Sequence, residues 1–521
     1  MNESQHTPPI PADLPQSTGE CHALIRQRDA LIAAMARDIE QYRRRIDWLA
    51  RRLFGRKSEK IDAATLDLFG AGEDTAAAEE GKIPEPETKM RPAARSGHGR
   101  KPLPRDLPRE RREYDLSEAQ KVCPECGETR QRIGEDVTEQ LEYVPASLFV
   151  IEHVQFKYAC KHCQGGVAQA EKPAQPIEKG LPGPGLLAHV VTSKYCDHLP
   201  LNRQESILAR HGVELSRSTL CDWTMDAATL LEPVVRAMQR NMLQSAAINT
   251  DDTPVPVQDK VKTHRAHLWV YIGDADHPYN IYDFTWTRGR EGPEKFLEHY
   301  EGYLQADAYS GYDSLYAKGR IVEVACWAHA RRYFFEAKGA DPVRAHAALL
   351  RIGEMYRVEH EARDLDANAR RALRRERTAP LLEAFARWLE ENRERVLPKS
   401  PIGQAISYAR NHWVALCRFV QDGDLAIDNN AAERALRPIC VGRNNWLFAG
   451  SLRGGHAGAI LYSLIASAKR HGLDPFAYLR DLLALIPTFP HKSIGLLFPD
   501  KWKAMQARAE DVPPEETQRA D

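Results

Sequence analysis

Three acidic side chains of this chain are placed so that they could bind metal ions together. Asp251 follows a short apolar run at residues 246–250, and Asp307 follows a strand-like run at residues 303–306. If those two strands are neighbours in a sheet, the aspartates converge, and Glu433, on a helix farther along the chain, could close the site from one side. Carboxylates suit two Mg²⁺ (or Mn²⁺) ions about 3.5–4 Å apart, which together activate a hydroxyl and stabilise a leaving oxygen. The spacing therefore favours metal-dependent phosphodiester chemistry.

The spacing alone leaves other interpretations of these carboxylates open. Asp and Glu are common residues, and Asp251 or its neighbour Asp252 could be a turn residue. Glu433 could instead form a capping box with Asn430, three residues earlier. The trio is one hypothesis among several at this point.

Four of the ten cysteines form two CxxC pairs separated by 33 residues, and these are Cys123, Cys126, Cys160 and Cys163. Two such pairs can place four thiolates tetrahedrally around one Zn²⁺. The segment between them is strand-like, so residues 113–175 are predicted to form a zinc ribbon with two knuckles joined by a hairpin. All four ligand positions come from protein, which indicates a structural zinc. The alternatives are four unrelated cysteines or, less favoured, a redox pair.

The N-terminal elements are predicted to bring copies of the chain together. Over residues 20–54, apolar residues recur every seven positions, at Ile25, Ile32, Ile39, Ile46 and Leu53. Together with a second series three residues later, they form the seam of a coiled coil, and we expect a homodimer or higher oligomer. The alternative is one amphipathic helix packed on its own chain.

Residues 55–112 are predicted to be a linker that ends in a basic arm. Ala, Gly, Glu and Pro dominate the middle of this stretch, a composition that is poor for a core. Arg100 and Lys101, which precede Pro102, could lie extended along a DNA groove. The alternative is a solvated basic linker.

Residues 180–240 are predicted to be helical and to resemble a helix-turn-helix. One helix spans residues 202–211, a turn follows at 212–215, and Ser216 caps a second helix. Arg217, at the start of that second helix, would face DNA. A plain helical hairpin would give the same pattern.

Residues 245–450 are predicted to form the catalytic domain. Strand-like runs occur at residues 246–250, 267–272 and 279–286, followed by a helix at 293–299 and two further strands at 303–306 and 321–326. This order is typical of a ribonuclease-H-like core. A charged helical stretch at about 330–400 is expected to be an all-α insertion, and residues 451–521 a C-terminal helical region. The fold class is therefore multidomain α/β.

Composition sets limits on the class of protein. The 521 residues carry a formal net charge of −1, so a DNA-binding chain must concentrate its basic residues locally. The N-terminus is polar, and no run approaches the roughly 18 apolar residues of a membrane span. We expect a protein of the cytoplasm, associated with the nucleoid when bound to DNA, and no membrane partner.

Six motifs in order resemble transposases of the insertion sequence 66 family across nearly the whole chain. They are LFGRKSE at residues 53–59, the two CxxC pairs, TDDTPV at 250–255, ADAYSGY at 306–312, CWAHARR at 326–332, and DNNAAER at 428–434 running on to VGRNNW at 441–446. The resemblance implies a DDE-type catalytic domain with Asp251, Asp307 and Glu433 at the catalytic positions. It also favours Asp251 over Asp252 as the metal ligand.

The chain departs from the family pattern at two positions. Asp252 stands where the family usually has Glu. Asn444 stands where a basic residue often precedes Asn445 and Trp446, so activity could be reduced if that basic residue contacts DNA.

Basic residues close in sequence to the trio are candidates for holding DNA. His329, Arg331 and Arg332 could orient DNA or brace the active site. Arg434, Arg437 and Arg443 could grip phosphates, because guanidinium groups bind phosphate oxygens in pairs. The alternative for these arginines is surface ion pairing with the insertion.

The sequence thus predicts a DNA transposase. It would bind the ends of an insertion element, cleave a phosphodiester, and join the freed 3′-hydroxyl to target DNA. Its partners would be double-stranded DNA, both terminal inverted repeats and target, and accessory proteins of the same element. The rival predictions are a catalytically inactive or domesticated DNA-binding protein and a plain ribonuclease-H-like nuclease.

Overall fold

The computed structural model describes residues 29, 32, 35, 148–154, 157–159, 167–169, 173–178, 180–259 and 262–510. Asp29, Ile32 and Met35 are helical and exposed. The rest of the predicted coiled coil and the linker lie outside the described residues. So do Arg100, Lys101 and the four zinc-ligand candidates Cys123, Cys126, Cys160 and Cys163.

The chain divides into two compact units, residues 73–170 and residues 1–72 together with 171–521. In the first, β1 (Lys157–Ala159) pairs antiparallel with β2 (Val167–Gln169), in register from Lys157 opposite Gln169. This hairpin flanks the second CxxC pair in sequence, whereas the predicted hairpin joins the two pairs. The segment between the two CxxC pairs was predicted to be strand-like. That prediction is wrong for residues 148–154, which have no regular secondary structure.

Three helices open the described part of the second unit. These are α4 (Pro184–Tyr195), α5 (Leu201–Arg210) and α6 (Arg217–Met242). The predicted cap is confirmed, because Ser216 Oγ accepts the Thr219 N–H at the start of α6. The turn before it passes through Gly212, whose φ of 80° favours glycine. The helix boundaries therefore match the predicted helix, turn and second helix.

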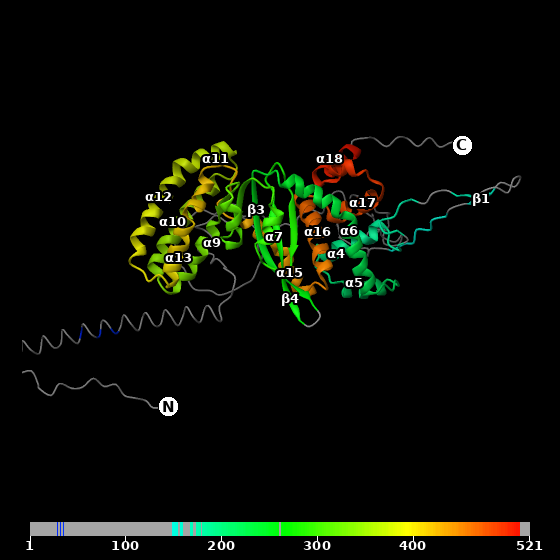
Figure 1. Ribbon diagram of the computed structural model, residues 1–521, viewed down its shortest axis with the longest axis horizontal. Helices are drawn as coiled ribbons and strands as arrows, with labels where there is room; N and C mark the ends of the chain where they lie inside the picture. Colours follow the sequence, from blue (N-terminus) through cyan, green and yellow to red (C-terminus); the bar gives the residue numbers. More distant parts are fainter. Residues whose placement is uncertain are drawn as a thin grey trace, which may run out of the picture. The chain divides into compact units, whose positions relative to one another are not determined.

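A mixed five-stranded sheet forms the centre of this unit, with strand order β5-β4-β3-β6-β7 (Figure 1). The strands are β3 (Ala247–Gln258), β4 (Thr263–Ile272), β5 (Asn280–Thr285), β6 (Gly302–Ala306) and β7 (Ile321–Ala325). β4 pairs antiparallel with β3 and β5, whereas β6 runs parallel to β3 and β7. Helix α7 (Glu291–Phe296) lies between β5 and β6 in the chain, as the sequence predicts.

The first strand is longer than predicted, so Asp251 lies inside β3 and not beyond its end. On one side the ladder with β4 continues to Gln258 opposite Thr263, but on the other side the pairing with β6 stops at Asn249 opposite Gln305. Prolines at positions 254 and 256 fall in this second half. A strand tolerates proline where one edge has no strand partner, because the missing N–H removes no ladder bond.

A group of helices follows β7 and builds its own core. It comprises α9 (Trp327–Glu336), α10 (Pro342–Glu361), α11 (Ala367–Leu373), α12 (Ala379–Arg393), α13 (Pro401–Asn411) and α14 (Trp413–Cys417). Buried Trp327, Phe334 and Phe385 lie at its centre. Figure 1 shows α9 to α13 on one side of the sheet, and α14 contacts β7. The helical stretch therefore runs from residue 327 to residue 417, beyond both ends of the predicted one at about 330–400.

The C-terminal helices complete the unit. They are α15 (Asn430–Trp446), α16 (Leu452–Arg470), α17 (Pro475–Leu485) and α18 (Pro499–Glu510). α15 packs against β3 and β4, while α16 contacts β5 and α6. In the described part of the chain, no helix is both long and apolar enough to cross a membrane.

Candidate active site

The register of β3 and β6 brings Asp251 and Asp307 to one place. Their last paired residues are Asn249 and Gln305, and each aspartate lies two residues beyond its member of that pair. Side chains alternate along a strand, and neighbouring strands are about 4.8 Å apart. Asp251 lies in β3 and Asp307 follows the end of the neighbouring strand β6, so the two carboxylates lie close enough to influence each other's charge.

Glu433 lies in the first turn of α15, and a buried asparagine fixes the start of that helix on the sheet. Asn429 Nδ2 donates to Thr250 O at 2.8 Å, and Asn429 Oδ1 accepts from Asn249 Nδ2 at 3.0 Å. The Asn429 N–H also points to Cys326 Sγ at 3.1 Å. These bonds connect α15 to β3 and to the end of β7.

The far end of α15 is fixed to the same strand by Arg443. Its Nη1 donates to Thr253 Oγ1 at 2.9 Å and to Pro254 O at 2.7 Å. The helix is therefore held against β3 at both ends. This contact gives Arg443 a structural role, and its predicted grip on phosphate stays a prediction.

The capping-box alternative for Glu433 is not what the structure shows. Asn430 bonds to Asp428 through its own N–H at 3.1 Å and its side chain at 2.8 Å. Glu433 Oε1 instead faces His329 Nε2 at 3.6 Å and Arg332 Nη2 at 4.0 Å. It is buried and has no hydrogen-bond partner among the described residues. Glu433 is therefore available for a ligand.

Burial dominates the electrostatics of the two aspartates. Burial raises the pKa of Asp251 to about 7, and the carboxylates of Asp307, Asp252 and Glu433 act in the same direction. The Asp252 N–H, which donates to Asp251 Oδ1 at 2.8 Å, opposes this rise. Burial also raises the pKa of Asp307, against the lowering effect of His329 and Arg288. The site thus concentrates negative charge that a cation would neutralise.

His329 and Arg332, both on α9, lie beside Glu433. Burial lowers the pKa of His329, although Glu433 and Asp307 oppose the shift. Arg331, on the same helix, lies with its guanidinium carbon 6.0 Å from the Phe335 ring. His329 and Arg332 contact Glu433.

The remaining predicted DNA contacts that the structure describes are arginines on α15 and α6. Arg434 and Arg437 are exposed on α15, in the turns that follow Glu433. Arg217 is exposed at the start of α6, where its backbone N–H bonds to Glu205 Oε1 at 3.1 Å. All three arginines are open to solvent, as a phosphate contact requires.

The carboxylates suit a divalent cation in chemistry but do not form a coordination shell as they stand. Within the described residues, no three His, Cys, Asp or Glu side chains lie close enough to hold one ion. Two observations fit a cation nevertheless. Glu433 Oε1 is buried without a hydrogen bond, and the carboxylates raise the pKa of Asp251 through repulsion. Oxygen donors of this kind are what Mg²⁺ prefers.

Comparison with known proteins identifies the family. The family model described as "Transposase IS66 family" matches residues 179–457, more than half of the chain. This chain belongs to the IS66 transposase family. Models for the family's "zinc-finger binding domain" and its "C-terminal element" match residues 120–164 and 463–499. One described as "Transposase C of IS166 homeodomain" matches residues 41–112.

Relatives of this transposase family member are found in Sinorhizobium fredii. The uncharacterized protein y4hP is 34% identical over 89% of both chains. The uncharacterized protein y4jD is 31% identical over 91% of this chain and 97% of its own length. A third, y4qI, is 36% identical over 71% of this chain and 72% of its own. The similarity thus spans nearly the whole transposase.

Sequence reasoning missed one group of residues beside the transposase's carboxylates. Asp252 Oδ2 bonds to His267 Nδ1 at 2.6 Å, and Asp252 Oδ1 accepts from Arg288 Nε at 2.9 Å. Burial alone would raise the pKa of Asp252, but these two hydrogen bonds bring it below its usual value. Arg288 Nη2 also lies 3.7 Å from Asp307 Oδ2. Only the strand register could have revealed His267, and the loop that carries Arg288 has no pattern that marks it.

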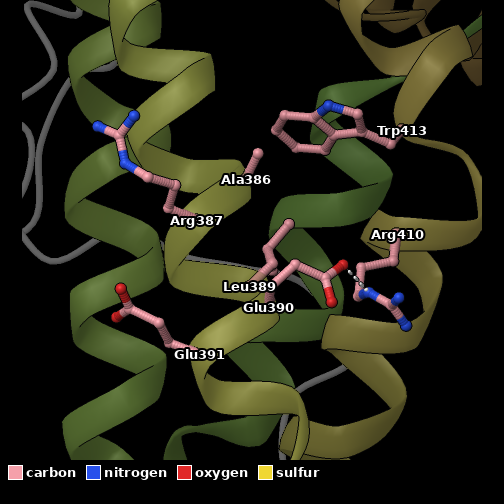
Figure 2. Close-up of a pocket in the computed structure, with 7 residues that line it drawn as sticks. All are labelled: Ala386, Arg387, Leu389, Glu390, Glu391, Arg410 and Trp413. Atoms are coloured by element: carbon pink, nitrogen blue, oxygen red, sulfur yellow. Dashed lines mark hydrogen bonds and ion pairs between the residues drawn. The ribbon is translucent and has the colours of Figure 1, made fainter.

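A separate pocket lies in the helical insertion of the transposase. Figure 2 shows it between α12 and α13, with Trp413 at one end and the Glu390–Arg410 ion pair, 2.6 Å long, at its side. None of the three carboxylates lines it. The candidate active site is therefore defined by the sheet and α15.

Proposed function

We propose that this IS66 family member is a DDE transposase with a ribonuclease-H-like catalytic core. The observation that carries the proposal is the parallel pairing of β3 and β6, which sets Asp251 beside Asp307. The strand order β5-β4-β3-β6-β7, with three antiparallel strands followed by two parallel ones, supports the same core. Glu433, on a helix fixed to β3 by Asn429, supplies the third carboxylate.

The roles of the residues follow from their places. Two Mg²⁺ (or Mn²⁺) ions, when bound, supply activation of the attacking hydroxyl and stabilisation of the leaving oxygen. Asp251 and Asp307 would hold them from the sheet, and Glu433 from α15. His329 and Arg332 orient the Glu433 carboxylate from α9. The product would be a 3′-hydroxyl that attacks target DNA in line.

Other parts of the chain would bind and pair the ends of the element. The start of α6 with Arg217, the basic arm with Arg100 and Lys101, and the zinc ribbon would contact double-stranded DNA. Four cysteines of the ribbon would hold one structural Zn²⁺. Arg437 on α15 would hold a flanking phosphate. The N-terminal coiled coil would join two copies so that both ends are processed in one complex, alone or with accessory proteins of the element.

Cleavage of labelled element-end DNA by the full-length protein in Mg²⁺ tests the proposal. Asp307→Asn should abolish cleavage and joining but leave the gel shift intact, because it removes a metal ligand and not a DNA contact. Asp313→Asn is the matched control, since Asp313 is exposed on the helix that follows and carries the same charge. Equal activity of the Asp307 and Asp313 variants would remove Asp307 from the mechanism.

A second candidate is an inactive or domesticated DNA-binding member of the family. It rests on Asn444, which is exposed on α15 seven residues after Arg437 and therefore two turns along the same face. A neutral side chain there offers no charge to a phosphate. Specific gel shifts without cleavage in any divalent metal would favour this candidate.

A further inference from the structure

The Arg288 guanidinium stands beside the proposed active site but is held by residues outside it. Arg288 Nη2 lies 2.8 Å from Asp252 Oδ1 and 3.7 Å from Asp307 Oδ2. Its side chain is 43% exposed, whereas that of Asp252 is 4% exposed. Arg288 therefore extends from the buried Asp252 carboxylate to the solvent-facing edge of the carboxylate cluster.

Asp252 and His267 form a buried pair with little freedom to move. The Asp252 carboxylate uses both oxygens, one for Arg288 and the other for His267 Nδ1 at 2.6 Å. The His267 side chain is 7% exposed and comes from the neighbouring strand β4. A buried carboxylate with two such partners is fixed by the sheet itself, and so is the edge of the guanidinium that it binds.

An aromatic side chain fixes the plane of the guanidinium. Arg288 Cζ lies 4.2 Å from the centre of the Tyr309 ring, and the Tyr309 hydroxyl donates to Arg288 O. Tyr309 itself packs edge-on against Tyr312, at 5.7 Å between ring centres. Because Tyr309 comes two residues after Asp307, the same short segment holds the carboxylate and the arginine in a fixed relation.

In this arrangement, one edge of the Arg288 guanidinium has no partner among the described residues. Two of its three nitrogens, Nε and Nη2, face Asp252, while Nη1 has no hydrogen bond to any other described residue. A guanidinium held on one edge and open on the other is suited to a further anion. The anion that approaches Asp307, if the proposed function holds, is a phosphodiester of DNA.

We propose that Arg288 forms a phosphate-binding subsite of the active site, with Asp252, His267 and Tyr309 as its positioning residues. Arg288 binds a non-bridging oxygen of the scissile phosphodiester or of one adjacent to it. This inference rests on the proposed function, since it takes DNA as the ligand of the same site. The rival role for Arg288 is that of a structural counter-ion to Asp252 alone.

Removing the charge from single phosphates of the DNA tests the subsite. Element-end DNA would carry a neutral methylphosphonate at the scissile position or at one of its neighbours, one position at a time. Single-turnover cleavage in Mg²⁺ and binding by fluorescence anisotropy in Ca²⁺ would be measured for the wild type, Arg288→Gln and Arg290→Gln. Arg290 is exposed two residues away and has no ion pair among the described residues, so it is the matched control.

The expected result is that, at the phosphate that Arg288 contacts, the losses of cleavage and binding caused by the DNA change and by Arg288→Gln do not multiply. At one phosphate, methylphosphonate should weaken the wild type and Arg290→Gln by about 10- to 100-fold, the range of a charged hydrogen bond. Arg288→Gln should show a similar loss on unmodified DNA and no further loss from methylphosphonate at that phosphate. At every other phosphate, the loss caused by methylphosphonate and the loss caused by Arg288→Gln should multiply. Arg288→Lys, which keeps the charge but not the fork, should fall between.

Two outcomes would overturn the proposal. One is multiplication of the two losses at every phosphate, including those next to the scissile bond. The other is an Arg288→Gln protein that unfolds at the wild-type temperature and cleaves and binds as the wild type does. If the wild type binds element-end DNA but does not cleave it, the proposed function fails. The binding measurement in Ca²⁺ still decides whether Arg288 contacts a phosphate.

The positioning residues have a test of their own. His267→Asn keeps a donor close to the place of Nδ1, whereas His267→Leu removes it. Asn should preserve the methylphosphonate-sensitive contact, and Leu should reduce its size at that one phosphate. A uniform loss across all phosphates in the Leu variant would show that His267 supports the fold and does not position Arg288.

Discussion

Replacing Asp251 by Asn should make the metal-free protein more stable, because the ionised carboxylate destabilises the folded state. Its pKa rises from 3.8 to about 7, mainly through burial and then through the neighbouring carboxylates. The unfolded chain therefore loses this proton at lower pH than the folded chain does. Stability falls as pH rises from about 4 to 7 and stays reduced above that. Asn keeps the oxygen that accepts the Asp252 N–H.

The size of the effect follows from the shift. Each pKa unit corresponds to about 1.4 kcal/mol, so the wild type is expected to lose about 2 kcal/mol at pH 5 and about 4 kcal/mol at pH 8. Asp251→Asn should recover up to these amounts. Urea unfolding in EDTA, followed by the fluorescence of tryptophans such as the buried Trp269, measures the difference.

Asp283 gives a matched control on β5, outside the carboxylate cluster. Burial raises its pKa to about 6, so Asp283→Asn should gain about 3 kcal/mol at pH 8. Saturating Mg²⁺ should stabilise the wild type and Asp283→Asn equally but Asp251→Asn much less, since only the last loses a ligand. A destabilised Asp251→Asn protein, or an unchanged response to Mg²⁺, would refute the reasoning.

Three further predictions concern the contacts of α15 with β3 and, separately, the predicted zinc site. Arg443→Ala should lower the free energy of unfolding by about 2–3 kcal/mol, because it removes two bonds from α15 to β3. Arg437→Ala, which is exposed, should leave stability unchanged and reduce the salt dependence of DNA binding by about one phosphate contact; equal stability losses for both variants would contradict this distinction. Asn429→Ala should cost about 2–4 kcal/mol in thermal or urea unfolding and lower cleavage, because Thr250 O and Asn249 lose their partner; wild-type cleavage would show that α15 needs no such anchor. Atomic absorption should find one zinc per wild-type chain and much less in Cys160→Ser, and an unchanged zinc content would refute the predicted ligand set.

Local patterns were sufficient to predict most of the elements. The start of α6 followed from Ser216 as a cap, and β5, β6 and β7 were predicted to within one residue from aromatic and branched residues, whereas β4 begins four residues before its predicted start. β3 was predicted too short, because Asp, Thr and Pro at positions 251–256 are typical of a turn. Their strand conformation depends on β4 and α15, which the local sequence does not contain.

The site could be predicted only where its residues share a motif or a strand order. Asp251 and Asp307 followed from neighbouring strands, and the choice of Glu433 needed the family resemblance. Asn429 meets Asn249 across 180 positions of sequence, and Arg288 meets Asp252 across 36. Such contacts depend on tertiary packing and leave no periodic signal. This is why the contacts of Asn429, His267 and Arg288 came only from the structure.

The central claim is that Asp251, Asp307 and Glu433 hold divalent ions at one site. Anomalous scattering from Mn²⁺ in crystals of the full-length protein with element-end DNA tests it most directly. We predict peaks between these three carboxylates, with a peak lost or displaced in Asp307→Asn and unchanged in the control Asp313→Asn. Peaks elsewhere in crystals that still cleave the DNA would contradict the account.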